Sequence, residues 1–257
     1  MRSYLRAAYS AAIRARQDAT ASDDLRVLGI STNPARDLAT IEGGNNARAR
    51  ALSLAELRAY WQRIRAAPGA RGALLRLHLL TGGQRIAQLS RLEISHLDGD
   101  AGTVRILDIK GRRKQPRQHV VPLLPDARRA IDLMRGEALG PYLVTVNEGV
   151  SPADYDVLRG AMDQVMNAML SADELPGGPF TPGDIRRTVE TRLAACGQTD
   201  EARGQLQSHG LGGVQNRHYN QHRYDAEKRE ALDKLYELLT APAATVTPIT
   251  RHVSKAG

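Results

Sequence analysis

The side chains best suited to chemistry lie between residues 180 and 224. Arg186 and Arg187 follow the sequence Thr-Pro-Gly-Asp, which predicts the start of a helix, where anions are favoured. His209 lies in a Ser-His-Gly turn, and Tyr219 follows ten residues later. Guanidinium groups bind phosphate oxygens in forked geometry, and a tyrosine hydroxyl is an oxygen nucleophile. The stretch is therefore typical of phosphoryl-transfer chemistry.

The helix that carries the two arginines has clear boundary signals. Thr181 can cap its N-terminus, Pro182 suits the first helical position, and Asp184 stands where a capping box has its acidic residue. Gly197 is a typical helix end. We therefore expect at least one of the two guanidinium groups to project near the helix N-terminus.

Two upstream segments extend this pattern. Residues 81–85 read Thr-Gly-Gly-Gln-Arg, and residues 109–112 read Ile-Lys-Gly-Arg, before a His-Val-Val-Pro-Leu strand. Together with Asp-Ile-Arg-Arg-Thr at 184–188, His209 and Tyr219, they form an ordered set of boxes within residues 50 to 239. The set resembles the C-terminal catalytic domain of the tyrosine recombinase (phage integrase) family.

The resemblance implies a DNA-cleaving site and a role for each residue. It assigns the catalytic roles to Arg85 and Arg186 (phosphate clamp), Lys110 (general acid), His209 (phosphate contact) and Tyr219 (nucleophile). It implies a site-specific recombinase or integrase of a mobile element, acting on double-stranded DNA through a 3′-phosphotyrosyl intermediate. A 5′-hydroxyl from another strand resolves that intermediate, so no ATP, cofactor or metal is expected.

These residue types are those that metal-free cleavage of a DNA strand requires. A tyrosine hydroxyl is weakly nucleophilic at its free pKa of about 10, so nearby cations must favour its attack. Two arginines can stabilise the charge on the non-bridging oxygens. A lysine can protonate the leaving 5′ oxygen as a general acid.

Further basic residues are predicted to contact DNA. The segment between two predicted strands reads KGRRKQPRQH, and its cations either contact DNA or form an ordinary solvated loop. Lys114 is the alternative to Lys110 as the acid. Arg187 lies on the helix face, and His218 either contacts DNA or faces solvent. The predicted DNA contacts are Arg112, Arg113, Lys114, Arg187 and His218.

One position departs from the family pattern and leaves alternatives open. The family usually has a histidine three residues before the second arginine, where this chain has Gly183. One alternative is a recombinase-derived DNA-binding protein with weak or no cleavage, and another is a topoisomerase-like DNA relaxer. Tyr219 could also be a packing residue, as the neighbouring Tyr224 illustrates. A metal site at the histidines near Tyr219 is disfavoured, because no carboxylate or cysteine stands at ligand spacing.

The composition agrees with a polyanionic partner. The 257 residues include 36 Lys and Arg against 28 Asp and Glu, which gives a net charge of +8 and a pI near 9.9. Nucleic acid is the commonest partner of such a chain, and the alternative is a merely basic soluble protein. The single cysteine, Cys196, excludes an internal disulfide and is predicted to be buried. No apolar run approaches the ~20 residues of a membrane span, so we expect a cytoplasmic protein.

The elements that position these residues follow from the apolar pattern. It predicts a mainly α fold with a small antiparallel β-sheet (α+β), as in a tyrosine recombinase-like catalytic domain. The leucine-dense helix at 70–80 must lie in the core. The other predicted helices are at 54–66, from 84 onward, and at 126–136, 152–170 and 226–239, with strands at 94–97, 104–109 and 120–124.

The same pattern predicts the domain organisation. Residues 1–18 resemble the last helix of the family's N-terminal DNA-clamping domain, so most of that domain is expected to be missing. Residues 19–50 are predicted to be a linker, 51–239 the catalytic domain and 240–257 a disordered tail. The helix at 226–239 either docks on its own domain or packs on a neighbouring protomer in a homo-oligomer on DNA, from dimer to tetramer.

Overall fold

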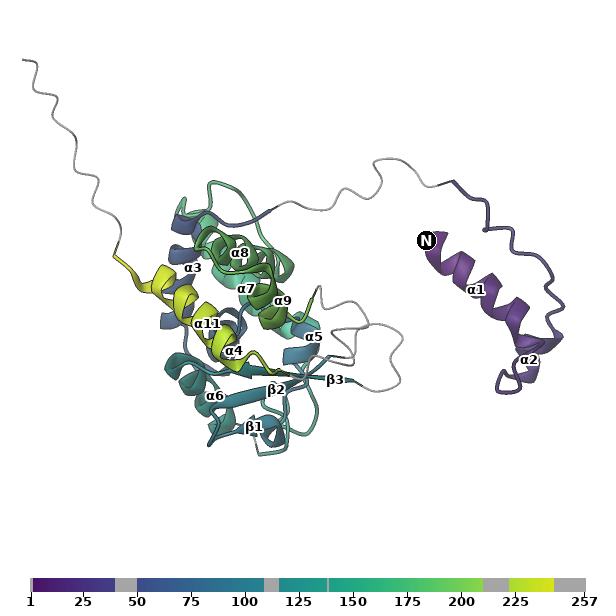
Figure 1. The fold of residues 1–257 in the computed structure, drawn as a ribbon, viewed down its shortest axis with the longest axis horizontal. Coiled ribbons are helices and arrows are strands. Elements are labelled where there is room, and N and C mark those ends of the chain that lie inside the picture. Colours follow the sequence, from purple (N-terminus) through teal and green to yellow (C-terminus); the bar gives the residue numbers. More distant parts are fainter. Residues whose placement is uncertain (1, 40–49, 109–115, 138, 210–221, 243–257) are drawn as a thin grey trace, which may run out of the picture. The chain divides into compact units, whose positions relative to one another are not determined.

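The computed structural model describes residues 2–39, 50–108, 116–137, 139–209 and 222–242 (Figure 1). The chain divides into two units, Met1–Ala49 and Arg50–Gly257. The first unit contains α1 (Arg2–Ala15) and the short helix α2 (Asp23–Val27), which falls in the segment predicted to be a linker. Within this unit, the Asn33 side chain donates hydrogen bonds to the Arg6 carbonyl and the Ser10 hydroxyl.

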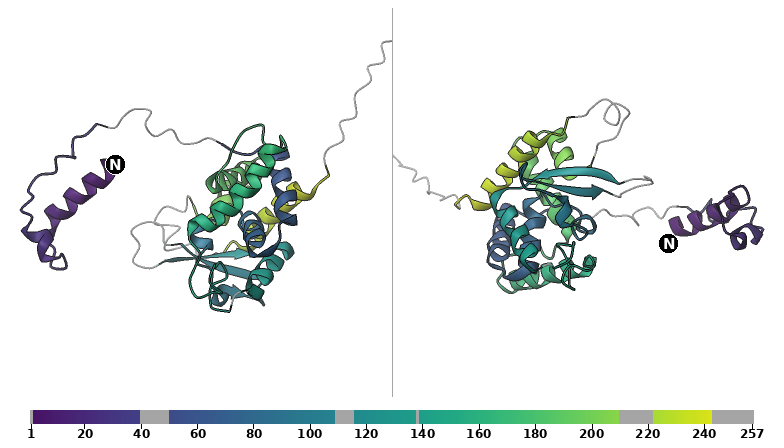
Figure 2. Two further views of the ribbon diagram at one scale, coloured as in Figure 1. Left: turned by 180° about the vertical axis from the view of Figure 1, so that it is seen from behind. Right: turned by 90° about the horizontal axis from the view of Figure 1, so that it is seen from below.

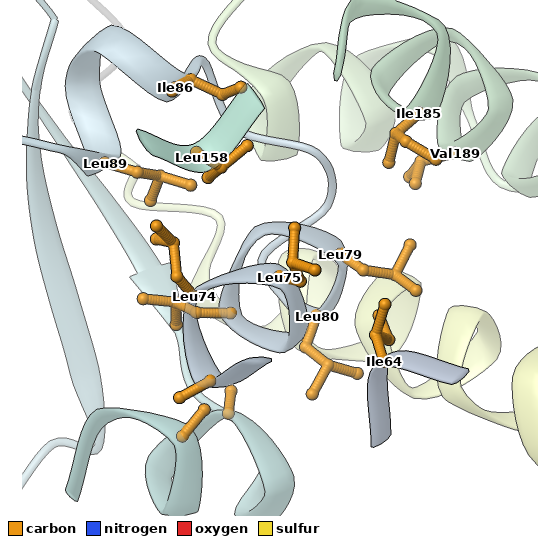
Figure 3. Packing of buried hydrophobic residues seen from close by; sticks show 14 of the residues in the cluster. Ile64, Leu74, Leu75, Leu79, Leu80, Ile86, Leu89, Leu158, Ile185 and Val189 are labelled. Atoms are coloured by element: carbon orange, nitrogen blue, oxygen red, sulfur yellow. The ribbon is translucent and has the colours of Figure 1, made fainter. Parts of the chain in front are cut away.

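Helix α4 (Gly69–Leu80) is the centre of the second unit. It packs against α3 (Leu54–Ala66), α6 (Pro125–Glu137) and α7 (Tyr155–Ser171). Figure 3 shows leucines of α4 between Ile64 of α3, Leu158 of α7 and Ile185 of α8 (Pro182–Ala195). The predicted core position of this helix is confirmed, because its leucines are all at most 2% exposed.

The three-stranded antiparallel sheet is confirmed, with its strands in the order β1-β2-β3. The strands are β1 (Leu97–Asp98), β2 (Thr103–Asp108) and β3 (Arg117–Pro122). Residues of β2 alternate between the two faces, so Val104, Ile106 and Asp108 share the buried face. A buried carboxylate therefore ends this strand, and it is paired in register with Arg117.

The first predicted strand is mostly wrong. Residues 94–96 form a 3-10 turn, η1 (Ile94–His96), and only two residues of strand follow it. The cause is local, because the Glu93 N–H donates to the Nδ1 atom of His96 and the His96 N–H to the Glu93 carbonyl. Such side-chain and turn bonds compete with the ladder of a sheet.

The remaining helices lie close to their predicted positions, with α8 beginning at a Thr181–Asp184 capping box. The helix predicted from residue 84 is the single turn α5 (Ile86–Leu89). After α8 the chain continues into α9 (Asp200–Gln207) and α11 (Asp225–Thr240). Helix α11 packs on its own unit, against α3, α8, α9 and β3 (Figure 2). Within the ranges that the structure describes, no helix has both the length and the apolar character to cross a membrane.

The prediction for Cys196 is wrong, because its side chain is exposed. Cys196 is the C-cap residue of α8, and Gly197 follows with a φ of +79°. The chain leaves the helix there in a left-handed turn, so the last side chain is directed to solvent instead of into the core.

Candidate active site

A glycine turn joins the first arginine box to the helix that carries the second. Gly82 and Gly83 have φ values of +86° and +69°, which disfavour any residue with a side chain. A Cβ atom at Gly83 would lie 2.7 Å from the Cα of Arg186, and one at Gly82 would lie 3.0 Å from the Leu206 side chain. The Arg186 Nη1 atom also donates to the Gly83 carbonyl at 3.2 Å. Only glycine allows this close approach of the turn to α8.

Arg85 is directed by a buried carboxylate. It is the N-cap residue of α5, and its Nη1 atom lies 3.4 Å from Oδ2 of Asp108. Asp108 also accepts from Nε2 of Gln88 at 2.6 Å and from the Ser208 hydroxyl at 2.9 Å. The carboxylate therefore connects the end of β2, the helix α5 and the segment after α9 at one point.

Asp108 is a site residue that the sequence motifs did not predict. Its one signal in the sequence is its place in an alternating strand, where it continues the buried face of Val104 and Ile106. A charged group in such a position needs partners, because burial of an unpaired carboxylate is costly. Here the partners include the guanidinium group of Arg85.

Arg186 is held by backbone carbonyls. Besides the Gly83 carbonyl, its guanidinium group donates to the Gln207 carbonyl, and Nη2 lies 3.4 Å from Nδ1 of His209. Burial and the positive charge of Arg85 lower the pKa of Arg186 to about 10, so it stays protonated at neutral pH. The two guanidinium groups are near enough for the charge of Arg85 to lower the pKa of Arg186, so they repel each other. An anion between them relieves that repulsion.

His209 lies beside this pair. Ser208 before it adopts a left-handed conformation with φ of +52°, and the His209 N–H donates to the Gly204 carbonyl. The imidazole is 40% exposed. Burial lowers its pKa, Glu190 opposes this, and the neighbouring arginines lower it further. The ring is therefore mostly neutral at pH 7 when no anion is bound.

Arg187 makes contacts within its own unit. Its Nη1 atom donates to the Arg50 carbonyl at 2.9 Å and to Oδ1 of Asp184 at 2.6 Å. It therefore links the beginning of the second unit to the capping box of α8. Its side chain is 39% exposed, and its contact with DNA stays a prediction.

The other predicted site residues lie outside the described residues: Lys110, Arg112, Arg113, Lys114, His218 and Tyr219. Two of them nevertheless stand close in the sequence to described site residues. Lys110 follows Asp108 by two positions, and Tyr219 follows His209 by ten. The structure thus brings together Arg85, Arg186 and His209 and leaves the remaining assignments as predictions.

A buried histidine supports the segment before His209. The His119 Nε2 atom on β3 lies 3.0 Å from the Leu206 carbonyl, and burial followed by the charge of Lys228 lowers the pKa of His119 to about 3. The ring is therefore neutral, and its N–H donates to the carbonyl. Gln84 donates to the same carbonyl at 2.8 Å. These two contacts fasten the end of α9 to the sheet and to the glycine turn.

Gly183 has open space around it. Among the described residues, a Cβ atom built there would meet only the Thr181 hydroxyl, at 3.7 Å. Packing therefore does not require glycine at the position where the family usually has histidine. Across the described ranges, no group of three or more His, Cys, Asp or Glu side chains is arranged to hold a metal ion.

Comparisons with solved structures find the same fold. The Tn1549 transposon integrase in complex with circular intermediate DNA matches with a TM-score of 0.54 and 17% identity, over 88% of this chain and 83% of that chain. A lambda integrase dimer bound to a COC′ core site matches with a TM-score of 0.53 and 17% identity, over 84% of this chain and 56% of that one. The integrase from mycobacterium phage Brujita matches with a TM-score of 0.52 and 16% identity, over 91% and 70%.

The sequence by itself gives no such match. No protein-family model matches the chain, and no curated protein matches it either. The likeness therefore rests on the path of the backbone, together with the ordered motifs. The chain has the fold of the tyrosine recombinases and integrases, with the mainly helical catalytic domain and small antiparallel sheet of that family.

Proposed function

We propose that the protein is a site-specific DNA recombinase that cleaves and rejoins strands through a 3′-phosphotyrosyl intermediate. One observation carries the proposal. Arg85 and Arg186 come from distant boxes, and the contact of Gly83 with α8 brings them to one place beside His209. A pair of guanidinium groups next to an imidazole is suited to a phosphodiester with two non-bridging oxygens.

The two arginines bind those oxygens and stabilise the charge that develops on them during attack. Asp108 directs the guanidinium group of Arg85, so its donors are positioned before the substrate arrives. His209 donates a further hydrogen bond to the same phosphate. Positioned donors in a partly buried site each contribute roughly 10²- to 10³-fold to the rate.

Tyr219 and Lys110, which are assigned from the sequence motifs, carry out the covalent steps in this proposal. The Tyr219 oxygen attacks the phosphorus as its hydroxyl proton passes to solvent, a new O–P bond forms, and the bond to the 5′ oxygen breaks. Lys110 gives its proton to the departing 5′ oxygen. In the second step a 5′-hydroxyl of another strand attacks the phosphotyrosine and its proton returns to Lys110, while the released Tyr219 oxygen takes up a proton from solvent. The phosphodiester energy is conserved throughout, so neither ATP nor a metal enters the scheme.

The partner in this scheme is double-stranded DNA. The net charge of +8 supports it, since binding to DNA releases counterions from its phosphates. Strand exchange needs more than one active site, so we propose assembly on DNA as dimers to tetramers. Helix α11 is the proposed contact between protomers, although its apolar residues in this structure cover its own unit.

Trapping on a nicked suicide DNA duplex tests the proposal. Cleavage releases a short fragment that diffuses away, so the covalent protein–DNA adduct accumulates. We expect the adduct in the wild type and in Tyr224→Phe, and none in Tyr219→Phe. Tyr224 is a matched control, because it is a nearby tyrosine whose hydroxyl donates to Glu201.

Two outcomes would replace the proposal. DNA binding without any adduct would favour the binding-only alternative. An adduct accompanied by relaxation of closed circles, without recombination between two sites, would favour the topoisomerase-like alternative.

A further inference from the structure

We propose that Glu190 is a positioning residue for His209, and that its carboxylate holds the imidazole with a proton on Nε2 so that Nδ1 faces the phosphate site. The inference rests on the proposed function, since the phosphate is the group that Nδ1 would serve. Glu190 follows Arg186 by four positions on α8, so both side chains lie on the same face of the helix.

One carboxylate oxygen of Glu190 is engaged and the other is not. Oε1 accepts from Nε of Arg203 at 2.8 Å. Oε2 is buried and has no hydrogen-bond partner within the described part of the chain. Nε2 of His209 lies 3.8 Å from Oε2. A buried acceptor without a partner is costly, and a displacement of less than about 1 Å would give it one.

The contact on the Nδ1 side of the His209 ring determines its neutral tautomer. Nδ1 of His209 lies 3.4 Å from Nη2 of Arg186. A guanidinium group has donors only, so Nδ1 must be the accepting nitrogen when the ring is neutral. The ring proton is then on Nε2, which faces the carboxylate of Glu190.

Among the described groups that shift the pKa of His209, Glu190 is the one that favours its protonation. Arg85 from the turn before α5, Arg186 from α8 and Arg203 from α9 all lower the pKa of His209, in addition to burial. Glu190 acts in the opposite direction. Without Glu190, burial and three positive charges would lower the pKa of His209 still further.

A protonated ring can donate on both sides. Its Nε2–H would bond Glu190, while its Nδ1–H would bond a phosphate oxygen held by Arg186. A carboxylate that orients a histidine and stabilises its imidazolium form is a recurring arrangement in active sites. In this chain it would make His209 an effective phosphate donor even though Gly183 supplies no imidazole.

NMR titration of the His209 ring in the DNA-free protein is the test. Loss of an opposite charge at this distance is expected to lower the pKa of His209 by about one unit in Glu190→Gln. Glutamine keeps an oxygen acceptor for Arg203, which protects the fold. Glu190→Asp should restore part of the shift. Glu174→Gln is the matched control, because Glu174 is also a half-buried partner of an arginine Nε, that of Arg63 at 2.6 Å.

The pH profile of single-turnover cleavage provides the second readout. If the imidazolium form is the active one, the rate falls as the pH rises through the pKa of His209. Glu190→Gln lowers that pKa, so the fall should move to lower pH by a similar amount. An unchanged His209 titration and an unchanged pH profile in Glu190→Gln would overturn the inference.

The two readouts separate this inference from the proposed function. A lowered pKa of His209 in Glu190→Gln, in a protein that forms no adduct with DNA, would support the role of Glu190 and overturn the recombinase proposal. An unchanged pKa of His209 in Glu190→Gln, in a protein that forms the Tyr219 adduct, would overturn the role of Glu190 and leave the recombinase proposal unaffected.

Discussion

The two arginines of the candidate active site are held in different ways. Arg85 contacts the buried carboxylate of Asp108, whereas Arg186 donates to the carbonyls of Gly83 and Gln207. An ionic partner neutralises a charge as well as directing it, but a carbonyl only directs it. Within the described residues, the Arg186 half has no carboxylate in direct contact, and burial followed by the charge of Arg85 lowers the pKa of Arg186 to about 10. We expect this half to provide more of the binding energy for the phosphate.

Removal of each arginine in turn tests this difference most strongly. Arg186→Ala is expected to slow single-turnover cleavage by ~10³-fold and Arg85→Ala by ~10²-fold, while much of the DNA binding is retained. Arg63→Ala serves as the control, because Arg63 pairs with Glu174 instead of a site residue. Equal losses of cleavage rate in Arg186→Ala and Arg85→Ala would contradict a larger contribution of Arg186 to phosphate binding.

The next target is the contact of Gly83 with α8, which brings Arg85 and Arg186 together. Gly83→Ala places a Cβ atom 2.7 Å from the Arg186 Cα at a φ of +69°, so the turn must move away from α8. We expect a loss of about 2 kcal/mol in the free energy of unfolding, measured in urea, and a fall of roughly 10²-fold in cleavage. Gly99→Ala is the control, because a Cβ atom there meets nothing within 4 Å. Wild-type stability in Gly83→Ala would show that the turn is not required to be glycine.

A smaller effect is expected in the Arg85 half alone. Asp108→Asn keeps an oxygen to accept from Gln88, and its NH2 group can donate to the Ser208 hydroxyl, but it removes the charge that directs Arg85. Cleavage should fall by about 10-fold, because a less ordered guanidinium group binds the phosphate less well. Single-turnover rates would measure this, with Asp163→Asn as the control for loss of an arginine partner. A loss as large as that of Arg186→Ala would mean that Asp108 does more than direct Arg85.

The smallest effect is expected at Gly183. The space around this residue admits a side chain, so Gly183→His should fold normally. If His209 already serves the phosphate, the added imidazole should change the cleavage rate only a few-fold, within what a redundant group contributes. A rise of about 10²-fold would instead show that the native site lacks a proton-transfer group.

Local signals in the sequence predicted the framework of this site well. The predicted Thr181–Asp184 capping box is formed, because it depends on residues three positions apart. The burial of the leucines in α4 likewise follows from their density along one helix. The boxes containing Arg85 and Arg186 were found for the same reason, since each is a short continuous motif.

Residues whose importance depends on distant partners were not predicted. Asp108 contacts Arg85 and Ser208, which stand 23 and 100 positions away in the sequence, and no local pattern marks either contact. Glu190 occupies an ordinary helix position, and only the fold of the 200–209 segment places His209 beside it. The short η1 turn was missed because two side-chain contacts outweighed an apolar run typical of a strand.

The central claim is that Tyr219 becomes covalently joined to DNA, and mass spectrometry of the trapped adduct tests it most directly. After digestion of protein and DNA, the residual nucleotide should be found on the peptide that contains Tyr219, joined through its 3′ phosphate. A nucleotide on Tyr224, or a linkage through a 5′ phosphate, would contradict the account.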